Sequence, residues 1–345
     1  MKNRDSVIDI AKGIGIFLVV LGHIPIPMEV AIPIYMFHMP LFFFLSGMFF
    51  NANEKLGYGV YKKIRTLIVP YFFFAFCGNM SNAIRDLIFS HSIRIHTIGQ
   101  LFDGAVSPLW FLICLFGCYF ICKLSESVCH NWRYLGLTSA IWGGIGMLLT
   151  SKNIHLPFWG TQVLLMQFFY VLGYFCKNVD IYGETLYARC LKTRNMGWLI
   201  ALVSFIACCF PFAIRPNVST LDFYHPLWFM LGAILGIYLI LALSKKLSDV
   251  KTFLATQFEQ MGNQSLFILG FHFFIIFHFY FFAIPLLMRI ANIVGWNFEG
   301  TYLRECYWLG ILFVIPSIFL SMYLGKWCHN KLGIFFRIQK KKVNI

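Results

Sequence analysis

Residues 32–50 read Ile-Pro-Ile-Tyr-Met-Phe-His-Met-Pro-Leu-Phe-Phe-Phe-Leu-Ser-Gly-Met-Phe-Phe and contain no Asp, Glu, Lys or Arg. A helix that crosses a lipid bilayer needs about 20 mostly apolar residues, and this stretch has that length and character. It therefore predicts a membrane-spanning helix.

Nine other stretches share this character. They lie near residues 7–22, 66–84, 101–121, 134–150, 158–176, 196–213, 226–243, 264–288 and 306–325. The stretch at 264–288 is long enough to tilt, or to break near Pro285. We expect an all-α fold, a polytopic membrane protein with about ten transmembrane helices. The transmembrane domain is expected over residues 1–325, followed by a short basic cytoplasmic tail over residues 326–345.

The composition of the chain agrees with this fold. Of 345 residues, 59% are hydrophobic and only 12% are charged, whereas a soluble domain carries about 25% charged residues. A secreted disulfide scaffold, a disordered chain and a nucleic-acid-binding domain are thereby excluded. The 11 cysteines are scattered and no two have metal-ligand spacing, so no metal site is expected.

The net charge of +14 indicates topology, because Lys and Arg gather in the cytoplasmic loops of membrane proteins. If the loops between the ten stretches alternate sides, one side receives 22 of the 28 Lys and Arg residues. The other side receives six: Arg85, Arg94, Lys152, Arg215, Arg289 and Arg304. We therefore expect both termini in the cytoplasm, with the basic side facing anionic lipid head groups.

Ionisable side chains inside a membrane span are costly, so each one is a candidate functional residue. The first span holds Asp9, Lys12 and His23. Lys12 and His23 are eleven residues apart, which places them within about 20° of one helix face and about 16 Å apart along its axis. Asp9 precedes Lys12 by three residues and can pair with it. A Lys that reaches the head groups and an interfacial His would explain the same residues structurally.

The second span holds His38 two residues before Pro40. Pro40 cannot donate to the carbonyl of Met36, so the helix is expected to open there. Freed backbone groups persist in a membrane only inside protein or beside a watery cavity. Because this span enters from outside, His38 lies at a depth similar to that of His23. A proline kink with a hydrogen-bonded His is the structural alternative.

Three weaker signals lie later in the chain. Gly262-Asn263-Gln264-Ser265 opens the ninth span, which buries His272, although His272 can also be a packing residue. Trp110 opens the fourth span, where an interfacial aromatic is common. Arg65 belongs to a basic group before the third span that can bind phosphate, and the general excess of cytoplasmic cations also explains it.

These motifs resemble the acyltransferase-3 family of integral membrane acyltransferases, especially its sugar O-acetyltransferase branch. That family opens with Arg, then Asp-x-x-Arg-Gly, and an apolar run that ends in Gly-His. The matching residues here are Arg4, Asp9-Ile-Ala-Lys12-Gly13, Gly22-His23, the Phe-His-Met-Pro-Leu-Phe-Phe-Phe-x-Ser-Gly signature at 37–47, Arg65 with Pro70, Leu109-Trp110-Phe111-Leu112, and Gly262-Asn263-x-Ser265 followed by His272. One residue departs from the family, because Lys12 keeps the charge of the usual Arg but loses its planar two-pronged geometry.

The resemblance implies a membrane-embedded O-acyltransferase of the bacterial cytoplasmic (inner) membrane, surrounded by lipid and with no nucleic-acid partner. The donor would be an acyl-CoA, above all acetyl-CoA, acting as a co-substrate, with no bound cofactor. The acceptor would be a hydroxyl of a surface polysaccharide or its lipid-linked precursor.

The resemblance also implies roles for single residues. His23 is the preferred base, because imidazole exchanges protons near neutral pH, and a covalent acyl-His is a variant of this role. His38 is the second catalytic candidate, and Lys12 and Arg65 would face the donor phosphates. The supporting residues are Asp9, Ser46, Trp110, which would stack on a sugar, and His272.

A transporter or flippase for a lipid-linked saccharide is the alternative function. Ten helices, intramembrane histidines and a span broken by proline suit it equally well. This alternative predicts no glycan acetylation and an internal inverted repeat, and no such repeat is evident in the sequence.

Overall fold

The computed structural model describes residues 5–90, 108–129, 131–181, 183–192, 195–223, 226–295 and 307–331. Helices make up most of these residues. In chain order they are α1 (Ser6–Gly22), α2 (Met28–Gly47), α3 (Leu56–Lys63), α4 (Val69–Ser90), α6 (Trp110–Cys129), α7 (Trp132–Ser151), α8 (Gly160–Asn178), α9 (Leu186–Leu191), α10 (Asn195–Cys209), α11 (Pro226–Val250), α12 (Phe253–Asn263), α13 (Ser265–Ile293) and α15 (Tyr307–Lys331). A π-helix, η1 (Ile64–Ile68), joins α3 to α4, and a 3-10 turn, η2 (Pro157–Trp159), precedes α8. The short strands β1 (Asp180–Ile181) and β2 (Glu184–Thr185) pair antiparallel.

Each of the ten predicted stretches coincides with a helix, namely α1, α2, α4, α6, α7, α8, α10, α11, α13 and α15. The beginning of the fourth stretch, 101–107, lies outside the described residues, as do residues 332–345 of the predicted tail. Within the described ranges, six helical runs are long and apolar enough to cross a membrane: Met28–Gly47, Leu56–Ile84, Trp110–Val128, Pro226–Val250, Ser265–Ile293 and Gly310–Lys331. A predominantly helical fold with several helices suited to a membrane is therefore confirmed.

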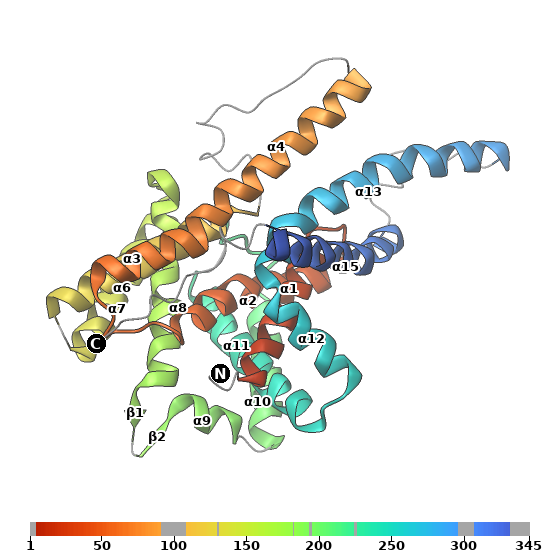
Figure 1. The fold of residues 1–345 in the computed structure, drawn as a ribbon. Coiled ribbons are helices and arrows are strands. Elements are labelled where there is room, and N and C mark those ends of the chain that lie inside the picture. Colours follow the sequence, from red (N-terminus) through yellow and green to blue (C-terminus); the bar gives the residue numbers. More distant parts are fainter. Residues whose placement is uncertain are drawn as a thin grey trace.

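The two helices that carry the first motifs form the centre of the molecule. Helix α1 packs against α12, α11, α2 and α13, while α2 packs against α8 and α11 as well. Figure 1 shows α1 and α2 enclosed by these helices, with α4 and α13 projecting beyond the rest of the bundle. Asp9 in α1 and His38 in α2 are accordingly buried in protein, where intramembrane polar groups are tolerated.

The outer helices carry large apolar side chains on their exposed faces. Examples from different helices are Phe76, Leu148, Ile200, Leu231, Phe282 and Leu312. Many exposed large apolar side chains on the outer helices are consistent with contact with lipid.

Helix α1 crosses α12 at very short range, and two glycines make this possible. A Cβ on Gly13 would lie 1.9 Å from the carbonyl oxygen of Phe258, and a Cβ on Gly262 would lie 1.8 Å from that of Asp9. Small residues let membrane helices approach backbone to backbone in this way. The first and last sequence motifs are thus held against each other.

Helices α2 and α8 cross in the same reciprocal manner. A Cβ on Gly47 would lie 1.7 Å from the carbonyl oxygen of Tyr170, and a Cβ on Gly173 would lie 1.9 Å from that of Phe44. The glycine that ends the 37–47 signature is therefore a packing residue, and it fixes the end of α2 that carries Ser46.

The prolines inside the spans do not end their helices. Helix α2 is a single α-helix through Pro40, and α13 continues through Pro285. The expected opening at Pro40 therefore does not interrupt α2, and the possible break near Pro285 is absent. Proline is accommodated in membrane helices because neighbouring helices and side chains compensate for the missing backbone hydrogen bond.

Candidate active site

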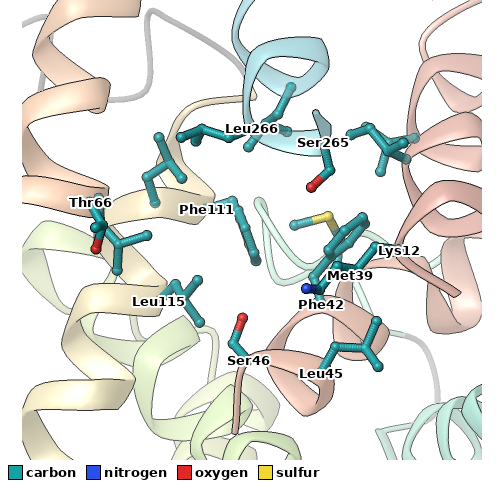
Figure 2. A pocket seen from close by; sticks show the side chains of 15 residues that line it. Lys12, Met39, Phe42, Leu45, Ser46, Thr66, Phe111, Leu115, Ser265 and Leu266 are labelled. Atoms are coloured by element: carbon teal, nitrogen blue, oxygen red, sulfur yellow. The ribbon is translucent and has the colours of Figure 1, made fainter. Parts of the chain in front are cut away.

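A cavity of about 230 Å³ lies between α1, α2, η1, α6 and α13. Most of its lining is apolar, and the polar side chains that reach it are those of Lys12, Ser46, Thr66 and Ser265. Figure 2 shows the hydroxyl groups of Ser46 and Ser265 pointing into the cavity from opposite sides. The cavity therefore suits a slender, mostly apolar group that needs a few hydrogen-bond partners.

One wall of the cavity is formed by the π-helix η1, which contributes Thr66 and Leu67. The hydroxyl of Thr66 donates to the backbone carbonyl of Lys62 at 3.0 Å. Single π-turns inside helices are rare and occur frequently at functional sites. No sequence signal marks this turn, because a run such as Ile64–Ile68 is as compatible with an ordinary α-helix.

Lys12 and Asp9 lie together at one end of the cavity, as their spacing predicted. Lys12 Nζ is 3.7 Å from Asp9 Oδ1, and Asp9 is buried. Lys12 Nζ also lies 5.0 Å from the ring centroid of Phe49, just beyond the end of α2. Lys12 is therefore anchored by a carboxylate on one side and an aromatic face on the other, with its stem in the cavity wall.

Two of the predicted histidines lie in contact at the opposite end. The ring centroids of His23 and His272 are 5.0 Å apart, with an interplanar angle of 69°. Val19 and Leu269 line the cavity four and three residues, about one turn, before these histidines in their own helices. The structure thus unites residues 249 positions apart in the sequence, and it places them just beyond the lining of the cavity.

His38 belongs to the same region through Tyr35. The rings of His38 and Tyr35 are 4.8 Å apart, and the Tyr35 hydroxyl donates to the carbonyl of Gly22 at 2.8 Å. Arg215 donates to the Tyr35 oxygen at 3.2 Å, and its guanidinium lies 4.6 Å from the ring centroid. Tyr35 therefore ties His38 to the residue that precedes His23.

Neither Tyr35 nor the approach of Arg215 to it was predicted from the sequence, where Arg215 served only as an indicator of topology. Tyr35 lies three residues before His38, so helical spacing alone would have drawn attention to it. Arg215 comes from a loop 180 residues away, and no local pattern marks its approach to Tyr35.

The three histidines share one hydrogen-bonding arrangement. The Nδ1 atoms of His23, His38 and His272 lie 2.7–2.8 Å from the carbonyl oxygen four residues earlier. Because a carbonyl can only accept, Nδ1–H is the donor, and the neutral ring carries its lone pair on Nε2. Nε2 of His272 is buried, with no hydrogen-bond partner in the described part of the chain. Each ring is thus oriented to act as a base through Nε2.

Two predicted residues lie beside the cavity without lining it. Arg65 is on η1, donates to the Tyr61 hydroxyl at 3.3 Å and precedes the lining residue Thr66. Trp110 is buried at the start of α6, next to Phe111, whose ring does line the cavity. Their roles toward donor and sugar stay predictions.

Comparison with known proteins identifies the family to which the chain belongs. The acyltransferase domain profile of the acyltransferase-3 family matches residues 5–331. The nodulation protein NolL of Sinorhizobium fredii (strain NBRC 101917 / NGR234) is 29% identical over 226 residues, covering 59% of this chain and 58% of the relative. NolL of Mesorhizobium japonicum (strain LMG 29417 / CECT 9101 / MAFF 303099) is 29% identical over 128 residues, covering 32% and 33% respectively.

The chain thus covers less than two thirds of the length of these two relatives. No solved structure matches it. Because the family profile spans residues 5–331 of 345, the chain belongs to the acyltransferase-3 family of membrane-embedded acyltransferases.

Proposed function

We propose that this protein is an O-acetyltransferase that moves an acetyl group from acetyl-CoA to a hydroxyl of a surface polysaccharide or its lipid-linked precursor. The observation that carries the proposal is the cavity, with an ammonium group at one end and paired imidazoles just past the other. An anionic donor with an apolar arm and a thioester at its tip is complementary to this arrangement.

The donor would enter from the Lys12 end. CoA carries its phosphates at one end, and Lys12 can meet a phosphate as a point charge. Lys12 and His23 are about 16 Å apart along α1, a distance that the extended pantetheine arm of CoA can bridge. The hydroxyls of Ser46 and Ser265 point into the cavity and are placed to bond the amide groups of that arm.

The proton would be handled by His23. Its Nε2 takes the proton of the acceptor hydroxyl while the hydroxyl oxygen attacks the thioester carbonyl. When the C–S bond breaks, His23 returns that proton to the sulfur, and free CoA leaves as a thiol. His272 lies in ring contact with His23, and its unpartnered Nε2 can accept a hydrogen bond from protonated His23.

The acceptor would approach over His38, Tyr35 and Arg215. Arg215 is exposed and stacked on Tyr35, so this end of the site is reachable from outside the bundle. Arginine and tyrosine supply the donors and the aromatic surface that sugars require. His38 would then position the hydroxyl that reacts at His23.

The surface glycans of a strain that lacks this protein test the function directly. We expect NMR of these glycans to show the loss of O-acetyl signals that are present in the parent strain and restored by the wild-type gene. A transporter or flippase would instead reduce the amount of the glycan and leave its acetylation unchanged, and that result would overturn the proposal.

We further propose ten membrane spans in the bacterial inner membrane, with both termini in the cytoplasm. Some of the ten proposed spans are short helices. One of them is α1, whose 17 residues reach the lower end of the range of about 17–25 residues for a membrane-spanning helix. The charge asymmetry predicts that a periplasm-dependent reporter, such as alkaline phosphatase fused after residue 345, stays inactive. Activity of that fusion, with inactivity of a fusion placed in the loop after α10, would contradict the topology.

A further inference from the structure

The ring of Phe49 holds two ammonium groups beside the cavity. Lys12 Nζ lies 5.0 Å from its centroid, and Lys177 Nζ, from the last turn of α8, lies 4.5 Å from it. The two nitrogens are therefore within about 10 Å of each other. Phe49 is 54% exposed, so this group of side chains faces the surface. We call Lys12, Phe49 and Lys177 the paired-lysine site.

The carboxylate beside Lys177 does not form a short ion pair with it. Lys12 Nζ and Lys177 Nζ each lie 3.7 Å from the nearest oxygen of Asp9 and Asp5, respectively. A charge-assisted hydrogen bond is about 2.7–2.9 Å long, and the Asp5 oxygen already accepts the Tyr187 hydroxyl at 2.9 Å.

Other lysines of the protein are paired more closely. Lys123 lies 2.6 Å from Glu126, and Lys192 lies 2.6 Å from Glu184. The side chains of Lys12 and Lys177 are 28% and 26% exposed. The Lys177 ammonium can therefore add a contact to an external anion without first giving up a short ion pair.

The position of the site indicates which anion it suits. Lys12 belongs both to the paired-lysine site and to the cavity lining. A single ligand could therefore place its anionic end at the paired-lysine site and the rest of the molecule in the cavity. Phosphate groups are bound by lysines as point charges. Arginine can bond two phosphate oxygens through its planar guanidinium group, whereas Lys12 offers a single ammonium. The ammonium of Lys177 supplies the second contact.

We propose that Lys177 and Lys12 jointly bind the phosphate groups of the acyl-CoA donor at the mouth of the cavity, an inference that rests on the proposed function. The same chemistry would suit the phosphate of an anionic phospholipid. The test therefore has to separate the two sources.

The inference is tested by calorimetry, which measures ligand binding to the purified full-length protein in phosphatidylcholine nanodiscs. The two probes are CoA and pantetheine, which lacks the phosphates. We expect Lys177→Gln to weaken CoA binding about 5- to 20-fold, because it removes a partly exposed charge-assisted contact, and to leave pantetheine binding unchanged. Lys177→Arg should retain CoA binding.

A matched control is Lys192→Gln, which removes the same charge just after the end of α9, where the Lys192 side chain is 73% exposed. It should bind CoA like the wild type. Equal CoA affinities of wild type and Lys177→Gln would overturn the paired-lysine site while leaving the proposed function intact, and equal losses for CoA and pantetheine would show a structural role instead. Absence of CoA binding by the wild type would overturn the proposed function and this inference together.

The lipid alternative has its own outcome. If the site binds a phospholipid, the Lys177→Gln effect on CoA should vanish in pure phosphatidylcholine, and wild-type CoA binding should weaken when phosphatidylglycerol is added. Persistence of the effect in phosphatidylcholine supports binding of the CoA phosphates.

Discussion

Replacement of His23 by Gln is expected to lower the rate of acetyl transfer by about 10²–10⁴-fold, the usual contribution of a general base. The Nδ1–H of His23 is committed to the Val19 carbonyl at 2.7 Å, which leaves the Nε2 lone pair for the acceptor hydroxyl. Gln can form hydrogen bonds but cannot carry the proton, and Ala can do neither. Both variants should therefore fail by a similar factor, measured as labelled acetyl transferred per amount of protein in isolated membranes.

His278→Gln is the matched control for this experiment. His278 also donates through Nδ1 to a carbonyl four residues earlier, that of Phe274, and its Nε2 lies 3.1 Å from the Ser81 hydroxyl between α4 and α13. It has a packing role outside the cavity, so its variant should keep near wild-type transfer. Near wild-type transfer by His23→Gln would instead make His38 the leading base, and equal losses in both variants would indicate a packing effect.

Local spacing was enough to predict part of this site. The i, i+3 pair of Asp9 and Lys12 forms because both residues belong to one helix, whose geometry fixes their distance. The ten helical stretches follow from apolar composition alone, since the bilayer requires runs of that length. The depth argument for His23 and His38 also led to one region of the structure, where Tyr35 connects them.

The rest depends on tertiary packing that no single stretch encodes. Contact between His23 and His272 requires α13 to lie against α1, and the sequence offered only a shared motif order. The joint approach of Lys12 and Lys177 to Phe49 requires the ends of α1, α2 and α8 to converge. These contacts depend on which helices pack together, and glycines permit the close backbone approach at two of the crossings, α1 with α12 and α2 with α8.

Gly262→Ala is accordingly expected to destabilise the protein and to disturb the donor end of the site together. The new Cβ would lie 1.8 Å from the carbonyl oxygen of Asp9, a backbone atom that cannot rotate away, so α12 would have to move off α1. Overpacking costs about 1–3 kcal/mol or more. The displacement would shift Lys12 on α1 and also Ser265, the first residue of α13, which is joined to α12 through Gln264.

Gly144→Ala in α7 is the matched control, because no described atom outside its own helix lies within 4 Å of a Cβ at this position. Ala is the better helix former by about 0.8–1.0 kcal/mol, so this variant should be as stable as the wild type or more stable. The measurement is the thermal midpoint of the detergent-solubilised protein, together with its affinity for CoA. A lower midpoint and weaker CoA binding in Gly262→Ala alone would establish that the closeness of α1 and α12 shapes the donor site. An unchanged midpoint would mean that the two backbones do not meet there, and the placement of Lys12 against Ser265 across the cavity would then lose its structural basis.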